Sequence, residues 1–222
     1  MKKITLAFFA SLLFSCSALA AAGIQEIDNS AAISAKYLDF GSGAAAAGMA
    51  NAYTGVAIDS AAIFWNPAGL ANMQKNSKDW NVYFSQNMWL VGVMDSMVSD
   101  IAAAKHIKKI GVFGAGISYY NAGKIERAGI DSLGNPVPSD DTYSPYSLCV
   151  NAAYSSALED GIDFGVNLKY LLDVIDGDAA HGVAFDVGVR YAFPFLKGLS
   201  LNITAKNFGG RLNESIMARE MD

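Results

Sequence analysis

Four charged residues in the last third of the chain are the side chains best suited to act together chemically: Asp163, Lys169, Asp186 and Arg190. Carboxylates beside basic groups can transfer protons in catalysis, or they can form ion pairs with one another. No nucleophile elbow, phosphate-binding glycine loop or paired-cysteine motif accompanies them. The simpler interpretation is that these charged side chains form ion pairs with one another inside the folded protein. The sequence therefore predicts that the protein is not an enzyme.

Candidate metal ligands are few and poorly spaced. His106 and His181 lie far apart and lack neighbouring cysteine pairs, so the ligand spacing of a zinc site is missing. Asp176-Gly177-Asp178 resembles the start of a calcium loop but lacks the glutamate at the twelfth position. A hairpin turn explains these three residues better. We expect no metal and no cofactor.

The charged positions belong to segments whose polarity alternates with the period of two that defines a strand. Residues 161–172, 182–191 and 199–206 each place apolar side chains on one face and small or polar ones on the other. The predicted polar face carries six residues of interest: Asp163, Asn167, Lys169, Asp186, Arg190 and Lys206.

Weaker alternation predicts four more strands, which brings the expected total to about seven: 80–86, 89–98, 113–119 and 146–154. Residues 121–142 are predicted to form a long polar loop, and residues 99–109 a shorter connection. Short and long connections of this kind are typical of outer-membrane barrels.

Two all-β architectures fit these strands. A face of small and charged residues suits the lumen of an antiparallel transmembrane β-barrel, with the apolar face toward outer-membrane lipid. Hydrophobic residues make up 52% of the chain and charged residues 17%, against about 25% in soluble domains. We favour the barrel, and a soluble periplasmic β-sandwich that acts as a binding module is the alternative. A net charge of −5 without a Lys/Arg cluster argues against nucleic-acid binding.

The N-terminus carries an export signal. Lys2 and Lys3 precede a short apolar run, and Ala18-Leu19-Ala20 fits a signal-peptidase site, so residues 1–20 are predicted to be a signal peptide. Cys16 leaves open a second reading, in which a lipoprotein is processed at that residue. Together with the strands, export predicts the bacterial outer membrane as the location.

Residues 21–79 are predicted to form a small helical or coiled hatch rather than strands. The stretch 41–73 is rich in Gly and Ala, whose small side chains allow close packing of backbone. Asn66-Pro67-Ala68-Gly69 is a turn signal, in which Asn caps, Pro fixes φ and Gly permits a positive φ.

The run from Leu38 to Met73 resembles the start of the PorV/PorQ family of outer-membrane proteins, which are relatives of the FadL fatty-acid channels. The matching marks include Gly48-Met49, Asp59-Ser60-Ala61-Ala62 and Phe64-Trp65-Asn66-Pro67-Ala68-Gly69-Leu70. The resemblance implies a FadL-like barrel of about fourteen strands with an inward-folded hatch. Its hatch motif would comprise six residues: Met49, Asp59, Asn66, Pro67, Ala68 and Gly69.

The resemblance also implies two possible roles in the outer membrane. FadL relatives pass hydrophobic compounds, whereas PorV serves type IX protein secretion by holding exported cargo. The partners would accordingly be hydrophobic small molecules, or secretion-machinery and cargo proteins.

The strands between residues 80 and 210 are too few for such a barrel, and residues 211–222 contain no further spanning segment. We therefore expect a C-terminally truncated, partial barrel followed by a short tail.

Overall fold

The computed structural model describes residues 35–209, except 77–78, 90, 93–94, 131, 134, 159–160 and 197. The chain divides into two units, residues 1–34 and 35–222, and the description below concerns the second. The predicted signal peptide, its alternative processing at Cys16 and the tail 211–222 lie outside the described residues.

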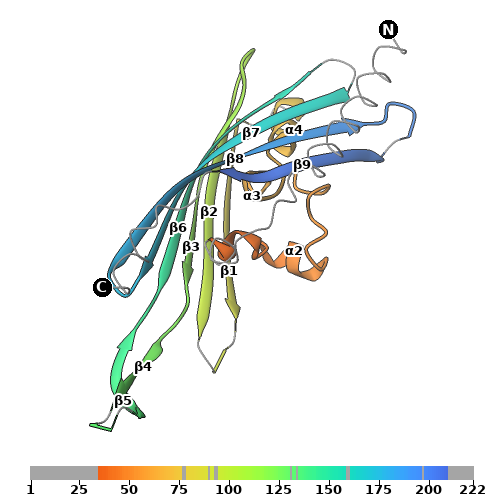
Figure 1. Ribbon diagram of the computed structural model, residues 1–222. Coiled ribbons are helices and arrows are strands. Elements are labelled where there is room, and N and C mark those ends of the chain that lie inside the picture. The colour runs from red at the N-terminus through yellow and green to blue at the C-terminus, as the bar shows by residue number, and fades with distance from the viewer. Residues whose placement is uncertain are drawn as a thin grey trace, which may run out of the picture. The chain divides into compact units, whose positions relative to one another are not determined.

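The described chain is mostly antiparallel β-structure, which confirms the all-β class (Figure 1). One sheet contains seven strands, in the order β1-β2-β3-β6-β7-β8-β9, and every neighbouring pair is antiparallel. Their bounds are β1 Trp80–Trp89, β2 Ser96–Ile107, β3 Gly111–Asn121, β6 Tyr146–Ala157, β7 Ile162–Ile175, β8 Asp178–Ala192 and β9 Ser200–Gly209. Among the described residues β1 and β9 do not pair with each other, so this sheet is open.

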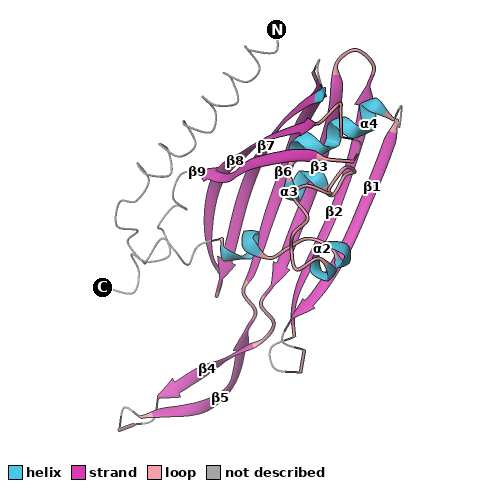
Figure 2. Ribbon diagram, turned by 90° about the vertical axis from the view of Figure 1, so that its right-hand side faces the viewer, coloured by secondary structure: helices cyan, strands magenta, loops and turns pink. Residues whose placement is uncertain are grey.

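The prediction of a long loop over residues 121–142 is wrong. A separate two-stranded hairpin forms there, from β4 (Ile125–Ile130) and β5 (Pro136–Tyr143), and it projects beyond one end of the main sheet (Figure 2). Arg127 ties the hairpin together by an ion pair to Asp141 and joins it to the β7–β8 turn through Asp176. The prolines and acidic residues of β5 obscure its alternation in the sequence.

The predicted strand over 89–98 is also wrong, because β1 ends and β2 begins inside that range. Asp95 adopts a left-handed φ of 52°, and its carboxylate accepts a hydrogen bond from Gly92 N at 2.7 Å. The chain therefore turns before Ser96, and most of the predicted connection 99–109 belongs to β2.

Short helical elements from residues 36–75 cover one face of the sheet (Figure 2). They are η1 (Lys36–Asp39), α2 (Ala44–Gly48), α3 (Ala62–Trp65), η2 (Pro67–Leu70) and α4 (Ala71–Lys75). Ile63, Leu70 and Met73 are fully buried against small residues of the strands, including Ala102 and Ala153. We call residues 35–75 the hatch and the sheet face beneath them the inner face. No helix in the described part of the chain is long and apolar enough to cross a membrane.

The two faces of the sheet have inverted polarity. In β7, Asn167 and Lys169 lie on the inner face and are buried, whereas Leu168 between them is 57% exposed on the outer face. The register carries this arrangement across the sheet, since Leu168 pairs with Phe185, which is also exposed. Polar side chains are therefore buried under the hatch while apolar side chains are presented outward, the reverse of the pattern in a soluble one-layer sheet.

Candidate functional site

A buried polar network connects β6, β7 and β8 under the hatch. Lys169 Nζ lies 2.8 Å from Asp186 Oδ2, and their side chains are only 4% and 1% exposed. Asn167 Nδ2 donates to Asp186 Oδ2 at 3.2 Å, to Asn151 Oδ1 at 2.9 Å and to the hatch carbonyl of Ile63 at 3.2 Å. Isolated charges are costly to bury, and this network supplies the partners that make their burial tolerable.

A β-bulge brings two consecutive residues of β9 to the inner face. The register with β8 shifts between Phe185 and Val187, and Asn207 has a left-handed φ of 60°. As a result Asn207 Oδ1 accepts a hydrogen bond from Lys169 at 2.6 Å, and Asn207 N donates one to Asp186 at 2.8 Å. Lys206 Nζ reaches the hatch and donates to the carbonyl of Phe64 at 2.8 Å.

A second ionic cluster joins the end of the hatch to the sheet. Asp163, whose side chain is fully buried, contacts Lys75 of α4 at 2.6 Å and Arg190 of β8 at 3.1 Å. All six residues predicted to lie on the polar face are thus on the inner face, where they form two clusters, one around Asp186 and one around Asp163.

The Asn66-Pro67-Ala68-Gly69 segment docks directly on the sheet. Asn66 caps η2, since its Oδ1 accepts a hydrogen bond from Ala68 N at 3.1 Å, and Pro67 is the first helical residue. A Cβ on Gly165 would overlap the backbone of Pro67 and Ala68, and one on Gly188 would overlap the Asn66 side chain. These two glycines of β7 and β8 therefore let the hatch backbone lie against the sheet.

Gly69 has a different role from the predicted one. It does not adopt a positive φ, and a Cβ there would collide with the carbonyl of Ala57. The residue is required by close approach of two backbone segments of the hatch rather than by the geometry of a turn.

The remaining two residues of the predicted hatch motif lie apart from this contact. Asp59 caps a local turn through a 2.9 Å hydrogen bond from Ala61 N to its Oδ1. Met49 follows α2 and is 43% exposed. The structure thus brings together the four residues from Asn66 to Gly69 but neither Met49 nor Asp59.

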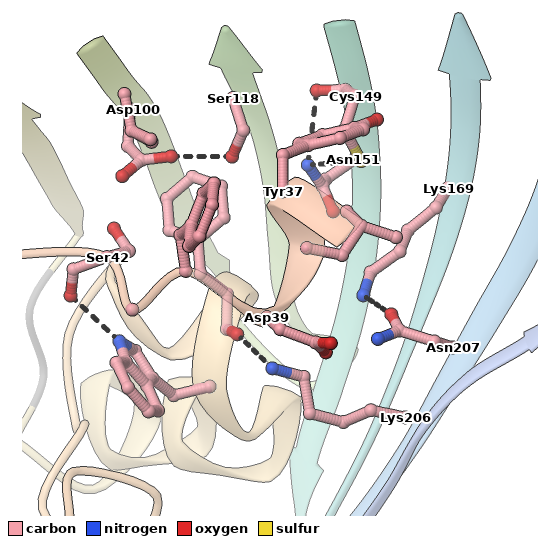
Figure 3. A pocket seen from close by; sticks show the side chains of 16 residues that line it. Tyr37, Asp39, Ser42, Asp100, Ser118, Cys149, Asn151, Lys169, Lys206 and Asn207 are labelled. Carbon is pink, nitrogen blue, oxygen red and sulfur yellow. Dashed lines mark hydrogen bonds between the residues drawn. The ribbon is translucent and has the colours of Figure 1, made fainter. Parts of the chain in front are cut away.

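A cavity of about 380 Å³ lies between the hatch and the inner face (Figure 3). Hatch residues 37–42 and the aromatic side chains of Phe64 and Trp65 form one side of it. Polar residues from five strands form the other: Asp100, Ser118, Asn151, Lys169, Lys206 and Asn207. Burial raises the pKa of the Tyr37 phenol, which stays protonated and donates a hydrogen bond to the carbonyl of Leu148 at 3.3 Å.

Of the residues that line this cavity, the predicted site residues include only Lys169 and Lys206, and three of those missed are instructive. Asp100 falls in the range assigned to a connection, Asn207 leaves the strict alternation at the bulge, and Tyr37 precedes the Gly/Ala-rich stretch. The Asn207-Phe208-Gly209 sequence following an alternating strand is the one local signal that could have suggested the bulge.

Comparison with known proteins gave no match to a family model and no significant match among curated sequences. Among residues 35–209, apart from the gaps named above, no three His, Cys, Asp or Glu side chains are grouped closely enough to hold a metal ion.

Proposed function

We propose that this chain forms part of a β-barrel of the PorV/PorQ, FadL-like type in the bacterial outer membrane. Its hatch would control the passage of hydrophobic compounds across that membrane or hold cargo for type IX-like secretion. One observation carries the proposal, namely the inverted polarity of the sheet, with ion pairs buried under the hatch and apolar side chains exposed on the opposite face.

The outer face has the composition expected of a lipid-facing surface. Large apolar side chains are exposed along all seven strands of the sheet: Val82, Phe84, Ile101, Phe113, Ile117, Val150, Leu168, Val183, Phe185 and Leu201. In water a continuous apolar surface of this kind favours association or aggregation, and in a bilayer it is the stable arrangement. Among the described residues no second sheet lies over it, which a β-sandwich would require.

Tryptophan and tyrosine residues of the outer face lie mainly toward the two ends of the strands. Near one end they are Trp80, Tyr154 and Tyr191, and near the other Tyr119 and Tyr146, whereas Tyr170 shares a central row with Phe84, Ile117 and Val150. Lys105 Nζ lies 4.7 Å from the ring centre of Trp80, an arrangement that suits a lysine reaching toward the membrane–water interface.

The spacing of these aromatic residues suits an outer membrane. Tyr146 and Tyr154 are separated by eight residues of β6, about 27 Å at about 3.4 Å per residue. A strand tilt of about 40°, typical of membrane barrels, reduces this to about 21 Å along the membrane normal, close to the apolar band of about 25 Å.

The inner face suits a lumen occupied by a hatch. The hatch contributes backbone carbonyls to Asn167 and Lys206 and a lysine to Asp163, so it completes the polar network that the strands begin. The hatch is also held by apolar side chains, since Ile63, Leu70 and Met73 are fully buried against the strands. The polar contacts are the part of this interface that a passing or held compound could replace, and they support a gating or cargo-holding role.

Two equally exposed leucines provide a matched test of membrane placement. Leu168 is 57% exposed in the middle of the outer face, and Leu158 is 56% exposed just beyond β6. Each is replaced by Cys in a background that lacks both native cysteines (Cys16→Ser and Cys149→Ser), and vesicles containing the full chain are treated with a water-soluble and then a lipid-soluble maleimide. We expect the water-soluble reagent to label Leu158→Cys only and the lipid-soluble reagent to label Leu168→Cys. Equal labelling of both by the water-soluble reagent would favour the periplasmic binding module.

Transport and secretion are distinguished in cells that lack the gene. Loss of uptake of a labelled long-chain fatty acid, restored by the full chain, supports passage of hydrophobic compounds. Unchanged uptake with retention of normally exported proteins in the periplasm supports the secretion role.

A further inference from the structure

Two buried acids of the inner face, Asp100 of β2 and Asp173 of β7, have an unsatisfied oxygen and no ion pair within the described chain, and of these only Asp100 lines the cavity. The Asp100 side chain is 2% exposed, and its Oδ1 accepts a hydrogen bond from Ser118 at 2.6 Å. Its Oδ2 is buried and has no partner within 3.5 Å among the residues that the structure describes; the nearby Ser42 hydroxyl of the hatch is hydrogen-bonded to Tyr83. Asp100 lines the cavity under the hatch, as Figure 3 shows.

Comparison with Asp163 and Asp186 indicates that Asp100 lacks a cationic partner. Asp163 has Lys75 and Arg190 as partners, and Asp186 has Lys169, each within 3.1 Å. No lysine or arginine of the described chain lies within ion-pairing distance of Asp100. A buried carboxylate with an unsatisfied oxygen is expensive, and such groups in folded proteins ordinarily have a partner. The cavity is where a cationic partner can enter.

The cavity walls limit the kind of cation. Phe40, Phe64 and Trp65 line it, and aromatic rings attract organic cations through their faces while also contacting apolar groups. Its volume of about 380 Å³ lies at the small end of the range for ligand pockets. Phe40 and Asp39, from the hatch, are exposed and also line it, so the cavity has access to solvent.

The basic groups of the cavity are already engaged. Lys169 is paired with Asp186 and Asn207, and Lys206 donates to the carbonyl of Phe64 while lying 5.6 Å from the ring centre of Trp65. An anionic ligand would have to compete with these contacts, and it would also face the Asp100 carboxylate.

We propose that this cavity binds a small organic ammonium compound, whose ammonium group pairs with Asp100 and whose apolar body lies against the aromatic wall. The ammonium group donates hydrogen bonds to Asp100 Oδ2, and the aromatic side chains exclude water around it. This proposal does not require that the sheet lie in a membrane, because ligand binding is measured on the purified full chain.

The test uses 2-phenylethylamine as the probe, with titration calorimetry of the full chain in non-ionic detergent at pH 7. The neutral isostere 2-phenylethanol and the anion 3-phenylpropanoate serve as ligand controls that require no substitution in the protein. We expect the amine to bind about 10- to 100-fold more tightly than the alcohol, which is the range for a hydrogen bond to a charged group. The anion should bind no better than the alcohol.

A pair of variants makes the same test from the protein side. Asp100→Asn keeps the shape of the side chain and removes its charge, and it should weaken amine binding about 10- to 100-fold. Asp141→Asn removes the same charge from the exposed hairpin, which contributes no residue to the cavity lining, and should leave the affinity unchanged. Circular dichroism of both variants checks that they are folded.

Three results would overturn the proposal. They are equal binding of amine and alcohol to the unaltered chain, tighter binding of the anion, and amine binding that folded Asp100→Asn retains.

Discussion

Lys169 and Asp186 form an ion pair of 2.8 Å on adjacent strands, and both side chains are almost fully buried between the sheet and the hatch. Asn207, which the β9 bulge turns inward, hydrogen-bonds both members of the pair. The pair thus joins three strands at the place where the hatch lies over them.

Removing one partner of this pair should strongly destabilise the chain. We expect Lys169→Met to lower the free energy of unfolding by about 3–5 kcal/mol, because Asp186 is then a buried charge without its cation. The double variant Lys169→Met with Asp186→Leu should lose less than the two single variants together. Guanidinium unfolding in detergent, followed by tryptophan fluorescence, measures each value. Additive losses would indicate that the two charges do not interact.

The glycines beneath the hatch give a steric prediction. Gly165→Ala should destabilise the chain by about 1–3 kcal/mol, because the added methyl group overlaps the backbone of Pro67 and Ala68. The control is Gly48→Ala in α2, where no atom lies within 4 Å of the new Cβ and the substitution should stabilise by about 0.5–1 kcal/mol. The same unfolding measurement compares them, and equal effects would mean that the hatch does not approach β7 as described.

Loss of the Asn66 cap should loosen the hatch. Asn66→Ala removes the acceptor for Ala68 N in a fully buried position, and we expect a loss of about 1–2 kcal/mol. Asn72→Ala, which removes only a 3.4 Å exposed hydrogen bond to the carbonyl of Ile58, should cost less than about 0.5 kcal/mol. Limited proteolysis should cut the hatch faster in Asn66→Ala than in Asn72→Ala. Identical digestion rates would contradict the capping role.

Asp163 should matter more than either of its partners. Lys75→Ala leaves Asp163 paired with Arg190, and Lys75 is one-third exposed, so we expect a loss of about 1 kcal/mol or less. Asp163→Ala leaves two cations facing each other and should cost about 3 kcal/mol. Lys108→Ala, in the exposed turn after β2, is the matched control and should be neutral. The interpretation fails if thermal unfolding ranks Lys75→Ala as the more damaging variant.

Sequence alternation predicted the faces of β7 and β8, and of β9 as far as Lys206, because these segments keep a strict period of two under the hatch. Asn167, Lys169 and Asp186 were placed on the correct face for that reason, and the register then brings them together. Which of them would form ion pairs could not be predicted, since pairing depends on the shear between strands and on the position of the hatch.

The errors arose where local geometry interrupts the alternation. Asp95 adopts a left-handed conformation in the turn between β1 and β2, which the alternation pattern does not reveal. Asp100 was therefore assigned to a connection instead of to the inner face of β2. Asn207 also adopts a left-handed conformation, and it interrupts the alternation at the bulge in β9. Gly69 looked like a turn residue, and only the three-dimensional position of the Ala57 carbonyl reveals why glycine is needed.

The most direct test of the lipid-facing outer face uses the tryptophans as depth probes. The first variant carries Trp65→Phe and Trp89→Phe and retains Trp80, which is 62% exposed on the outer face. The second carries Trp80→Phe and Trp89→Phe and retains Trp65, which is buried. Both are reconstituted in vesicles whose phosphatidylcholine carries brominated acyl chains, which quench only tryptophans in contact with lipid. We predict strong quenching of Trp80 and little quenching of Trp65. Equal, weak quenching of both, with the protein recovered in the aqueous phase, would contradict the membrane-spanning sheet.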